Sequence, residues 1–375
     1  MIKQESEKGI KVTVCGGGRG GLSIAGDLTL LGHDVTLFQL PKFISSIEPV
    51  IEQKGIKVTG NTLSKKNGLA MPKSITVDPS EAFKEAEVIM VAIPGFGHDD
   101  LFEMIVEHLR DGQIIVINTG YWDSLRYKTL LEEHGKDVTI AETNLLVYLT
   151  SLVNPGEVYI SATKDKVKIA AMPATENKRV LEVVQKLYPQ FEEATSVLEI
   201  NLSNLNGFLH APVVTSNLGF IEKLGAEPFY FYRDGVTKSV GRIMEEVDKE
   251  RRAIAKALDI EVPTIMESYK EMYSPFGAKG TSMYEIIRTN KSAQEFAMET
   301  ATSAYDMTAE DIPCSFIPLI RLGEHLGVNV TVMKSLVELL SIGIDKDYES
   351  NAIALEDLGL SEMSPAQIKN YVLHG

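Results

Sequence analysis

Short runs of apolar, often β-branched residues recur along the first half of the chain at strand length. Five of them are almost continuously apolar, which is typical of strands buried on both faces of a parallel sheet; they span residues 11–15, 34–39, 88–93, 113–118 and 138–142. Helical patterns, such as residues 21–31 and 101–110, lie between them. This alternation predicts a doubly wound α/β sheet that binds its ligand at the carboxyl ends of the strands. Two further runs, 158–162 and 168–172, are expected to extend the same sheet, and a helix is expected at about 177–187.

The pattern changes after about residue 198, where long amphipathic helical patterns replace the strand-like runs. In residues 239–258 the apolar side chains follow helical spacing, as at Val240, Val247 and Ile254. A chain of 375 residues is also longer than one ordinary hydrophobic core supports. We therefore predict an N-terminal doubly wound α/β domain at 1–198 and a C-terminal all-helical domain at 199–375.

Composition and charge narrow the class of protein. The chain is 44% apolar and carries a net charge of −15, which argues against a nucleic-acid partner. Its longest apolar runs are of strand length, so no membrane span is expected, and the polar N-terminus lacks the apolar core of a secretory signal. Cys15 and Cys314 lie far apart without a neighbouring histidine cluster, which suits a reducing compartment and indicates no metal site. We expect a soluble cytoplasmic protein.

A glycine-rich turn follows the first predicted strand. Its sequence, GGGRGG at 16–21, matches GxGxxG, and it opens a helix that leads to a second strand. In such a unit the first glycine permits a tight turn, the second lets a pyrophosphate approach the backbone, and the third lets the helix pack close to the strand. The helix N-terminus then offers free N–H groups to phosphate. The turn predicts a nicotinamide dinucleotide held by Gly16, Gly18, Arg19, Gly20 and Gly21.

The type of dinucleotide depends on the end of the second strand. An NAD-preferring site usually has an acidic residue there for the ribose hydroxyls, whereas this chain has Gln39, with Lys42 three residues later. Because no carboxylate repels a 2′-phosphate and Lys42 could pair with one, the sequence favours NADP slightly over NAD. Pro94 and His98 follow the third strand, at the sheet edge where cofactor and substrate meet, and we expect both to be cofactor-adjacent.

One histidine of the seven is the best candidate for chemistry. His210 and Asn206 lie four residues apart and would share one face of an otherwise apolar helix. A buried structural histidine is the competing interpretation. Downstream, Asp311 has two possible roles. It either interacts favourably with the positive N-terminal end of the dipole of a helix that starts near 308–313, or reaches an imidazole and stabilises its charged form. Spacing alone leaves both roles of Asp311 open.

Taken together, these residues resemble the opine dehydrogenases, the octopine/nopaline dehydrogenase family. The resemblance covers nearly the whole chain and is most specific over 201–257; other matching parts are the glycine turn, 93–94, 141–143 and 310–311. It implies a Rossmann domain joined to a helical domain, and a reductive condensation of an amino acid's amine with a 2-oxo acid by NADH or NADPH. The family's catalytic pair falls on His210 and Asp311, with the histidine as general acid/base.

Two positions depart from the family pattern. Relatives usually carry an arginine five residues before the aspartate, where it can clamp a substrate carboxylate, and this chain has Asp306 there. The proline that directly follows the histidine in relatives is displaced by Ala211. We expect Asn206 and Asp306 to contact substrate, and Asp306 to alter substrate choice, toward an amine with a second positive charge or a substrate lacking one carboxylate.

Two other functions fit the same two-domain frame. One is a carbonyl or 2-hydroxy acid reductase that needs no amine, and the other is a dinucleotide-sensing protein without turnover. The presence of both His210 and the Glu310-Asp311 pair favours an enzyme over a sensor. The oligomeric state is left open by the sequence, and a homodimer is one state that it allows.

Overall fold

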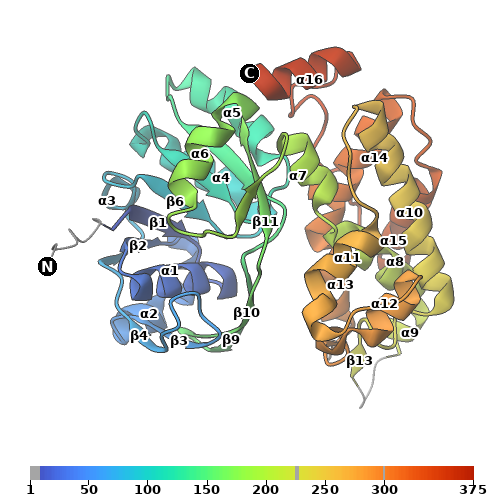
Figure 1. Ribbon diagram of the computed structural model, residues 1–375, viewed down its shortest axis with the longest axis horizontal. Coiled ribbons are helices and arrows are strands. Elements are labelled where there is room, and N and C mark those ends of the chain that lie inside the picture. The colour runs from blue at the N-terminus through green and yellow to red at the C-terminus, as the bar shows by residue number, and fades with distance from the viewer. Residues whose placement is uncertain (1–8, 224–227, 299) are drawn as a thin grey trace, which may run out of the picture. The chain divides into compact units, whose positions relative to one another are not determined.

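The computed structural model describes residues 9–223, 228–298 and 300–375 and divides them into two compact units (Figure 1). The first unit runs to Ile200 and includes Val372–Gly375, and the second is Asn201–Tyr371. The chain therefore passes between the units within helices α7 (Val197–Ser203) and α16 (Pro365–His374). The boundary predicted at 198/199 lies near the first of these crossings.

The first unit is built on an eight-stranded sheet of order β12-β11-β8-β7-β6-β1-β2-β5. Six strands are parallel, while β11 runs antiparallel to β8 and β12 pairs parallel with β11. The strands are β1 (Lys11–Cys15), β2 (Asp34–Phe38), β5 (Ser74–Thr76), β6 (Val88–Val91), β7 (Ile114–Ile117), β8 (Thr139–Thr143), β11 (Val167–Met172) and β12 (Phe191–Glu193). Because β1 lies between β2 and β6, the strand order reverses at the carboxyl end of β1, which is where such sheets bind ligands.

All five strands predicted from continuous apolar runs are present in this sheet, and so is the run at 168–172 as β11. The prediction that 158–162 extends the same sheet is wrong. That run is part of β10 (Glu157–Thr163), in a separate four-stranded sheet with β3 (Ile56–Gly60), β4 (Gly68–Ala70) and β9 (Tyr148–Asn154). Buried Val158 and Ile160 alternate with exposed Tyr159 and Ser161, the pattern of a strand with one face in solvent.

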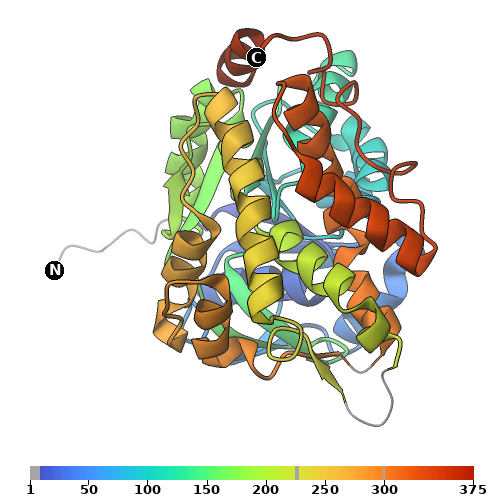
Figure 2. The same ribbon diagram turned by 90° about the vertical axis from the view of Figure 1, so that its right-hand side faces the viewer.

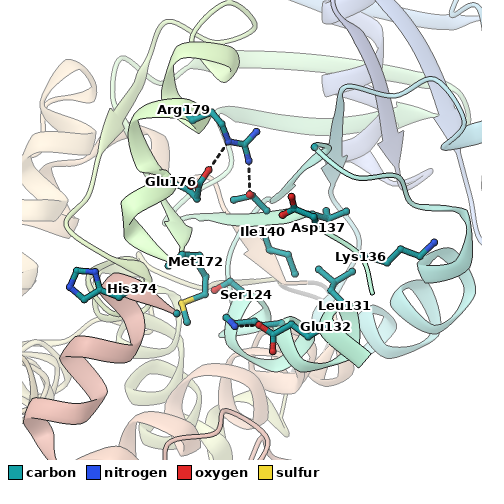
Figure 3. A pocket seen from close by; sticks show the side chains of 16 residues that line it. Ser124, Leu131, Glu132, Lys136, Asp137, Ile140, Met172, Glu176, Arg179 and His374 are labelled. Atoms are coloured by element: carbon teal, nitrogen blue, oxygen red, sulfur yellow. Dashed lines mark hydrogen bonds and ion pairs between the residues drawn. The ribbon is translucent and has the colours of Figure 1, made fainter. Parts of the chain in front are cut away.

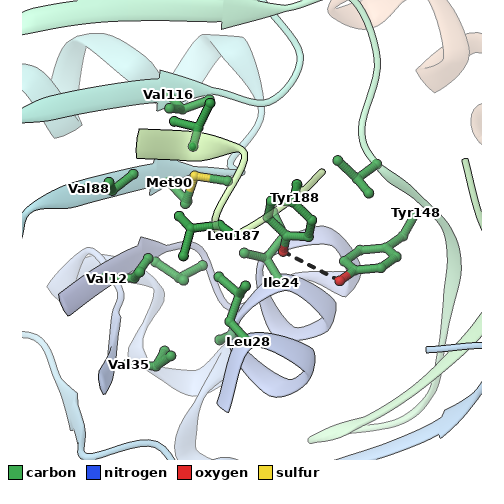
Figure 4. Close-up of a cluster of buried hydrophobic side chains, with 14 of the residues drawn as sticks. Val12, Ile24, Leu28, Val35, Val88, Met90, Val116, Tyr148, Leu187 and Tyr188 are labelled. Atoms are coloured by element: carbon green, nitrogen blue, oxygen red, sulfur yellow. Dashed lines mark hydrogen bonds between the residues drawn. The ribbon is translucent and has the colours of Figure 1, made fainter. Parts of the chain in front are cut away.

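Both faces of the main sheet are covered, so side chains of each strand alternate between two cores. One core joins the sheet to α1 (Arg19–Leu31), α6 (Asn177–Val184) and the smaller sheet, and Figure 4 shows Val12, Val35 and Met90 packed there against Ile24 and Leu28 of α1. The other core lies against α3 (Pro79–Ala82), α4 (His98–Ile105) and α5 (Asp123–Glu133). The short helix α2 (Glu48–Glu52) completes the helices of this unit. Burial on both faces explains why the predicted strands read as unbroken apolar runs.

The second unit is helical, as predicted, apart from a two-stranded ribbon of β13 (Phe229–Tyr230) and β14 (Ala297–Met298). Its helices are α8 (Asn206–Ser216), α9 (Leu218–Ile221), α10 (Lys238–Ala257), α11 (Ile265–Tyr273), α12 (Met283–Thr289), α13 (Ala301–Ala309), α14 (Ile317–His325) and α15 (Thr331–Ile344). The apolar α8 packs against α10, the long yellow helix in Figure 2, and against α13 and α15. In the described part of the chain, no helix combines the length and apolar character needed to cross a membrane.

A buried arginine fixes the corner at which α8 begins. Arg251 of α10 is fully buried and donates hydrogen bonds to the carbonyl oxygens of Leu202 (2.7 Å) and Pro263 (2.6 Å). Its charge is balanced by the buried carboxylate of Asp248, one turn earlier on α10. The guanidinium also lies 5.7 Å from the centroid of the Phe208 ring. One paired cation thus ties the end of α7 and the start of α8 to the long helix α10.

Candidate active site

The glycine turn has close backbone approaches at Gly16 and Gly21 and open space at Gly18. Gly16 has φ +130°, and a Cβ there would lie 2.5 Å from the carbonyl oxygen of Ala92, which follows β6. A Cβ on Gly21 would overlap the carbonyl oxygen of Gly16, so this position sets how closely α1 packs on β1. Gly18 is the N-cap of α1, and a Cβ there would meet nothing within 4 Å. An N-terminal turn without a capping side chain and with open space beside it suits a phosphate.

The other residues predicted to contact the cofactor have mixed surroundings. Arg19 is exposed at the start of α1, and Gly20 lies beside the side chain of Leu146. The buried amide of Gln39 donates to Ser46 Oγ (2.8 Å) and accepts from the backbone N–H of Leu40 (2.9 Å). Lys42 forms an ion pair with Asp100, both side chains being half exposed. Gln39 therefore shapes the loop after β2, and Asp100 shares the charge of Lys42.

His98 lies in the predicted segment, but its ring is turned into the fold. The side chain is 1% exposed, with Nδ1 2.9 Å from Asp123 Oδ1 and Nε2 3.1 Å from the carbonyl oxygen of Ile93. The imidazole thus links the loop after β6 to the first residue of α5. Pro94, in contrast, is exposed. Any cofactor contact by His98 would have to come from its backbone, because the ring is buried.

His210 and Asp311 are joined in the second unit. Nδ1 of His210 lies 2.6 Å from Asp311 Oδ2, across 101 residues of sequence, and the two residues are only 8% and 4% exposed. Of the two interpretations of Asp311 that the sequence left open, the structure supports the one in which it reaches an imidazole. An aspartate on Nδ1 holds the ring in one orientation, stabilises its charged form and leaves Nε2 for proton transfer. This arrangement is suited to general acid–base chemistry.

Local backbone features bring these two residues together. His210 lies in the middle of α8, whereas Asp311 lies between the end of α13 and a π-helical turn, Ile312–Phe316. A helical segment does start within 308–313, as expected: Asp311 is the N-cap of the π-helical turn, which continues directly into α14 (Ile317–His325). Gly207, one turn before His210, has no side chain to keep Phe316 away, and a Cβ there would lie 3.1 Å from the Phe316 ring. This glycine allows the π-helical turn to pack close to α8.

Tyr232 is a further contact of the histidine that the sequence did not indicate. Its hydroxyl lies 3.1 Å from His210 Nε2, the nitrogen that Asp311 leaves available. The preceding residue, Phe231, is buried and packs edge-on against the imidazole at a centroid distance of 5.5 Å. Burial raises the pKa of Tyr232 well above its ordinary value, with Tyr269, Tyr273 and Asp311 acting in the same direction. The side chain therefore remains a neutral phenol.

The two predicted substrate residues differ in their position relative to this pair. Asn206 is half-buried and lies one turn before His210 on α8, as predicted. Asp306 is exposed on α13, on a different face of that helix from buried Ala304 and Thr308.

The first unit also contains a cavity of about 710 Å³, whose lining includes neither the glycine turn nor the His210–Asp311 pair (Figure 3). Gly112 and Val138, which line it, precede β7 and β8, so it lies at the amino edge of the parallel strands, opposite the glycine turn. Its cationic side chains are already engaged, as in the bonds from Arg179 to Glu176 and Thr139. Among residues 9–223, 228–298 and 300–375, no group of three or more His, Cys, Asp or Glu side chains could hold a metal ion.

The glycine turn gives a prediction with an internal control. Gly18→Ala should fold with a stability within about 0.5 kcal/mol of wild type, because the methyl group enters open space, but should lower dinucleotide affinity at least about tenfold. Gly21→Ala should instead lower stability by about 1–3 kcal/mol, because its methyl group meets backbone. Thermal unfolding and fluorescence titration with NADH and NADPH measure both effects. Wild-type affinity in Gly18→Ala would contradict the assigned role.

Comparisons with known proteins agree with this arrangement. A family model of the α-helical domain of NAD/NADP octopine/nopaline dehydrogenase matches residues 193–343. A solved octopine dehydrogenase in complex with NADH and agmatine superposes with a TM-score of 0.78 at 20% identity, covering 95% of this chain and 98% of that one. A yersinopine dehydrogenase with NADP⁺ bound gives 0.75 at 14% identity, covering 97% and 99%. At such identities these structures establish the fold.

Membership of a family follows from a more similar sequence. The opine dehydrogenase of Arthrobacter sp. (strain 1C) is 31% identical over 361 residues, which cover 96% of this chain and 98% of that protein. The match thus spans the glycine turn, the helical unit and the His210–Asp311 pair alike. The chain belongs to the opine dehydrogenase family, NAD(P)-dependent oxidoreductases that act on CH–NH bonds.

Proposed function

We propose that the protein condenses an amino acid or related amine with a 2-oxo acid, reduces the resulting C=N bond, and catalyses the reverse oxidation. The observation that carries this proposal is the His210–Asp311 pair, buried in the helical unit that the family model matches. The fold alone would also suit a reductase that needs no amine. Its activity would be the same with and without an amine, whereas the proposed reaction requires both substrates.

His210 is assigned the proton transfers. Condensation passes through a carbinolamine, whose hydroxyl must gain a proton to leave as water, and the reverse reaction returns that proton to the base. Nε2 of His210 is the nitrogen assigned to these transfers, since Nδ1 is bound to Asp311. The carboxylate of Asp311 orients the ring and stabilises its charged form, so it is a positioning residue.

The glycine turn is assigned to the dinucleotide. What supports this is the open space at Gly18, the uncapped start of α1 and the exposed cation of Arg19. The cofactor, when bound, supplies or accepts the hydride. NADP is proposed as slightly preferred, because Gln39 places no carboxylate at the end of β2 to repel a 2′-phosphate. Lys42 could contribute to that preference only by exchanging its partner Asp100 for the phosphate.

The proposed substrates follow from the family resemblance and from the position at which this chain departs from the family pattern. Within the family, we propose a likeness to N-(1-D-carboxyethyl)-L-norvaline dehydrogenase, so an aliphatic amino acid and a short 2-oxo acid are the first substrates to test. Asn206, one turn from His210, is assigned to substrate binding. Asp306, where relatives carry arginine, cannot bind a carboxylate through a bidentate pair and favours a cationic group instead.

Replacing His210 tests the assigned catalysis. His210→Asn should lower turnover about 10²- to 10⁴-fold, because general acid–base catalysis contributes that much. Its affinity for NADPH should be unchanged, since the glycine turn belongs to the other unit. Steady-state rates and cofactor titration give the two values. His325→Asn, which replaces an exposed histidine of the same unit, is the matched control; near-normal turnover in His210→Asn would remove the assignment.

Replacing Asp306 tests its role in substrate choice. In a screen of amines against 2-oxo acids, Asp306→Arg should favour amino acids with a free carboxylate and disfavour amines with a second positive charge, by about tenfold in kcat/KM. The variant leaves Glu310, Asp311 and the π-helical turn after them unchanged. The measurement is the ratio of kcat/KM for the two classes of amine. An unchanged ratio would show that the exposed carboxylate of Asp306 does not select the substrate.

A further inference from the structure

Tyr232 occupies the nitrogen of His210 that the proposed chemistry requires. Its hydroxyl lies 3.1 Å from Nε2, while Asp311 lies 2.6 Å from Nδ1 on the opposite side of the ring. We propose that Tyr232 is a positioning residue that holds His210 as the neutral imidazole, with a proton on Nδ1 and with the lone pair of Nε2 accepting the hydrogen bond of the Tyr232 hydroxyl. The role of Tyr232 in catalysis rests on the proposed function, whereas the NMR test of its effect on His210 does not.

Counting protons gives the direction of each hydrogen bond. An ionised carboxylate only accepts, so the bond to Asp311 requires an N–H at Nδ1. A neutral imidazole then has a bare Nε2, which accepts the single O–H proton of Tyr232. All three side chains are satisfied in this state. In the charged imidazolium, Nε2 carries a proton as well, and the phenol would have to accept it and find another acceptor for its own.

Tyr232 is half-buried, among aromatic and titratable side chains. Its ring lies among Phe231 and Phe296, at centroid distances of 5.1 and 5.9 Å. The titratable groups that act on its hydroxyl are Asp311, near the π-helical turn, and Tyr269 and Tyr273 of α11. These groups all raise the pKa of Tyr232, as burial does, so the hydroxyl keeps its proton. Tyr232 is therefore a fixed donor over the working pH range.

The two partners of His210 consequently act in opposite directions. Asp311 favours the imidazolium, whereas a donor at Nε2 favours the neutral ring, because the bond that the hydroxyl donates can form only when that nitrogen is bare, and the reversed bond to the imidazolium requires a new acceptor for the hydroxyl proton. Losing the donor should let the ring take up its proton at higher pH. A hydrogen bond of ordinary strength corresponds to a three- to tenfold change in proton affinity, or a shift of about 0.5–1 pH unit.

The direct test is an NMR titration of ¹⁵N-histidine-labelled protein without substrate or cofactor. His210→Asn identifies the His210 signals among those of the seven histidines. In the wild type, the ¹⁵N shifts should show the Nδ1–H tautomer at high pH. In Tyr232→Phe, which keeps the ring and removes the hydroxyl, the midpoint of the His210 titration should rise by about 0.5–1 pH unit. Tyr273→Phe removes a nearby hydroxyl that is not bonded to His210, and should leave the midpoint within about 0.2 unit.

The activity profile provides the second readout. The oxidation of the secondary amine requires the neutral ring, so its rise in kcat/KM with pH should move upward by the same interval in Tyr232→Phe, with cofactor affinity unchanged. An Nε2–H tautomer in the wild type, or an unmoved midpoint in a folded Tyr232→Phe, would overturn the inference. If Tyr232→Phe does not fold, an Nε2–H tautomer in the wild type would still overturn the inference, because that nitrogen could not accept the Tyr232 hydroxyl. Should the wild type lack opine activity altogether, the proposed function fails while the titration still tests Tyr232.

Discussion

The contact between His210 and Asp311 is the constraint on which the catalytic interpretation depends. A buried imidazole and carboxylate lie 2.6 Å apart, although 101 residues separate them in the chain. Gly207 allows Phe316 to approach α8, which brings the Asp311 turn against the histidine. Buried Arg251 of α10, paired with Asp248, bonds to the carbonyl oxygen of Leu202 in α7, just before the same helix begins. Much of the architecture around α8 therefore serves to place two side chains within hydrogen-bonding distance.

The first unit follows a different design, because its candidate site is made of backbone. Gly16 and Gly21 set the path from β1 into α1, and Gly18 leaves that path accessible. The turn lies where the strand order reverses, between β1 and β6. A protein of net charge −15 repels anions at long range, so local N–H groups and Arg19 have to hold a dinucleotide. Cofactor binding and proton transfer are thus assigned to separate units and to different kinds of chemical group.

How much the sequence predicts depends on how local each feature is. The buried strands and the glycine turn are predictable because their patterns lie within a few consecutive residues. The run 158–162 predicts the strand β10 but not its sheet, because its parallel partner β3 lies far earlier in the chain. The pairing of Asp311 with His210 could be predicted only from the family resemblance, because no local sequence pattern indicates a partner 101 residues away. Tyr232 was missed because it lies in the aromatic run 229–232, which predicts a core and does not show which hydroxyl meets the histidine.

The central claim is that this site forms a bond between an amine nitrogen and the carbon of a 2-oxo acid. Incubating the enzyme with NADPH, a ¹⁵N-labelled amino acid and a 2-oxo acid labelled with ¹³C at its carbonyl carbon, followed by mass spectrometry, tests it most directly. The account predicts one secondary amine that carries both labels and forms in proportion to the NADPH consumed. A ¹³C-labelled 2-hydroxy acid without ¹⁵N, formed at the same rate when the amine is omitted, would contradict it.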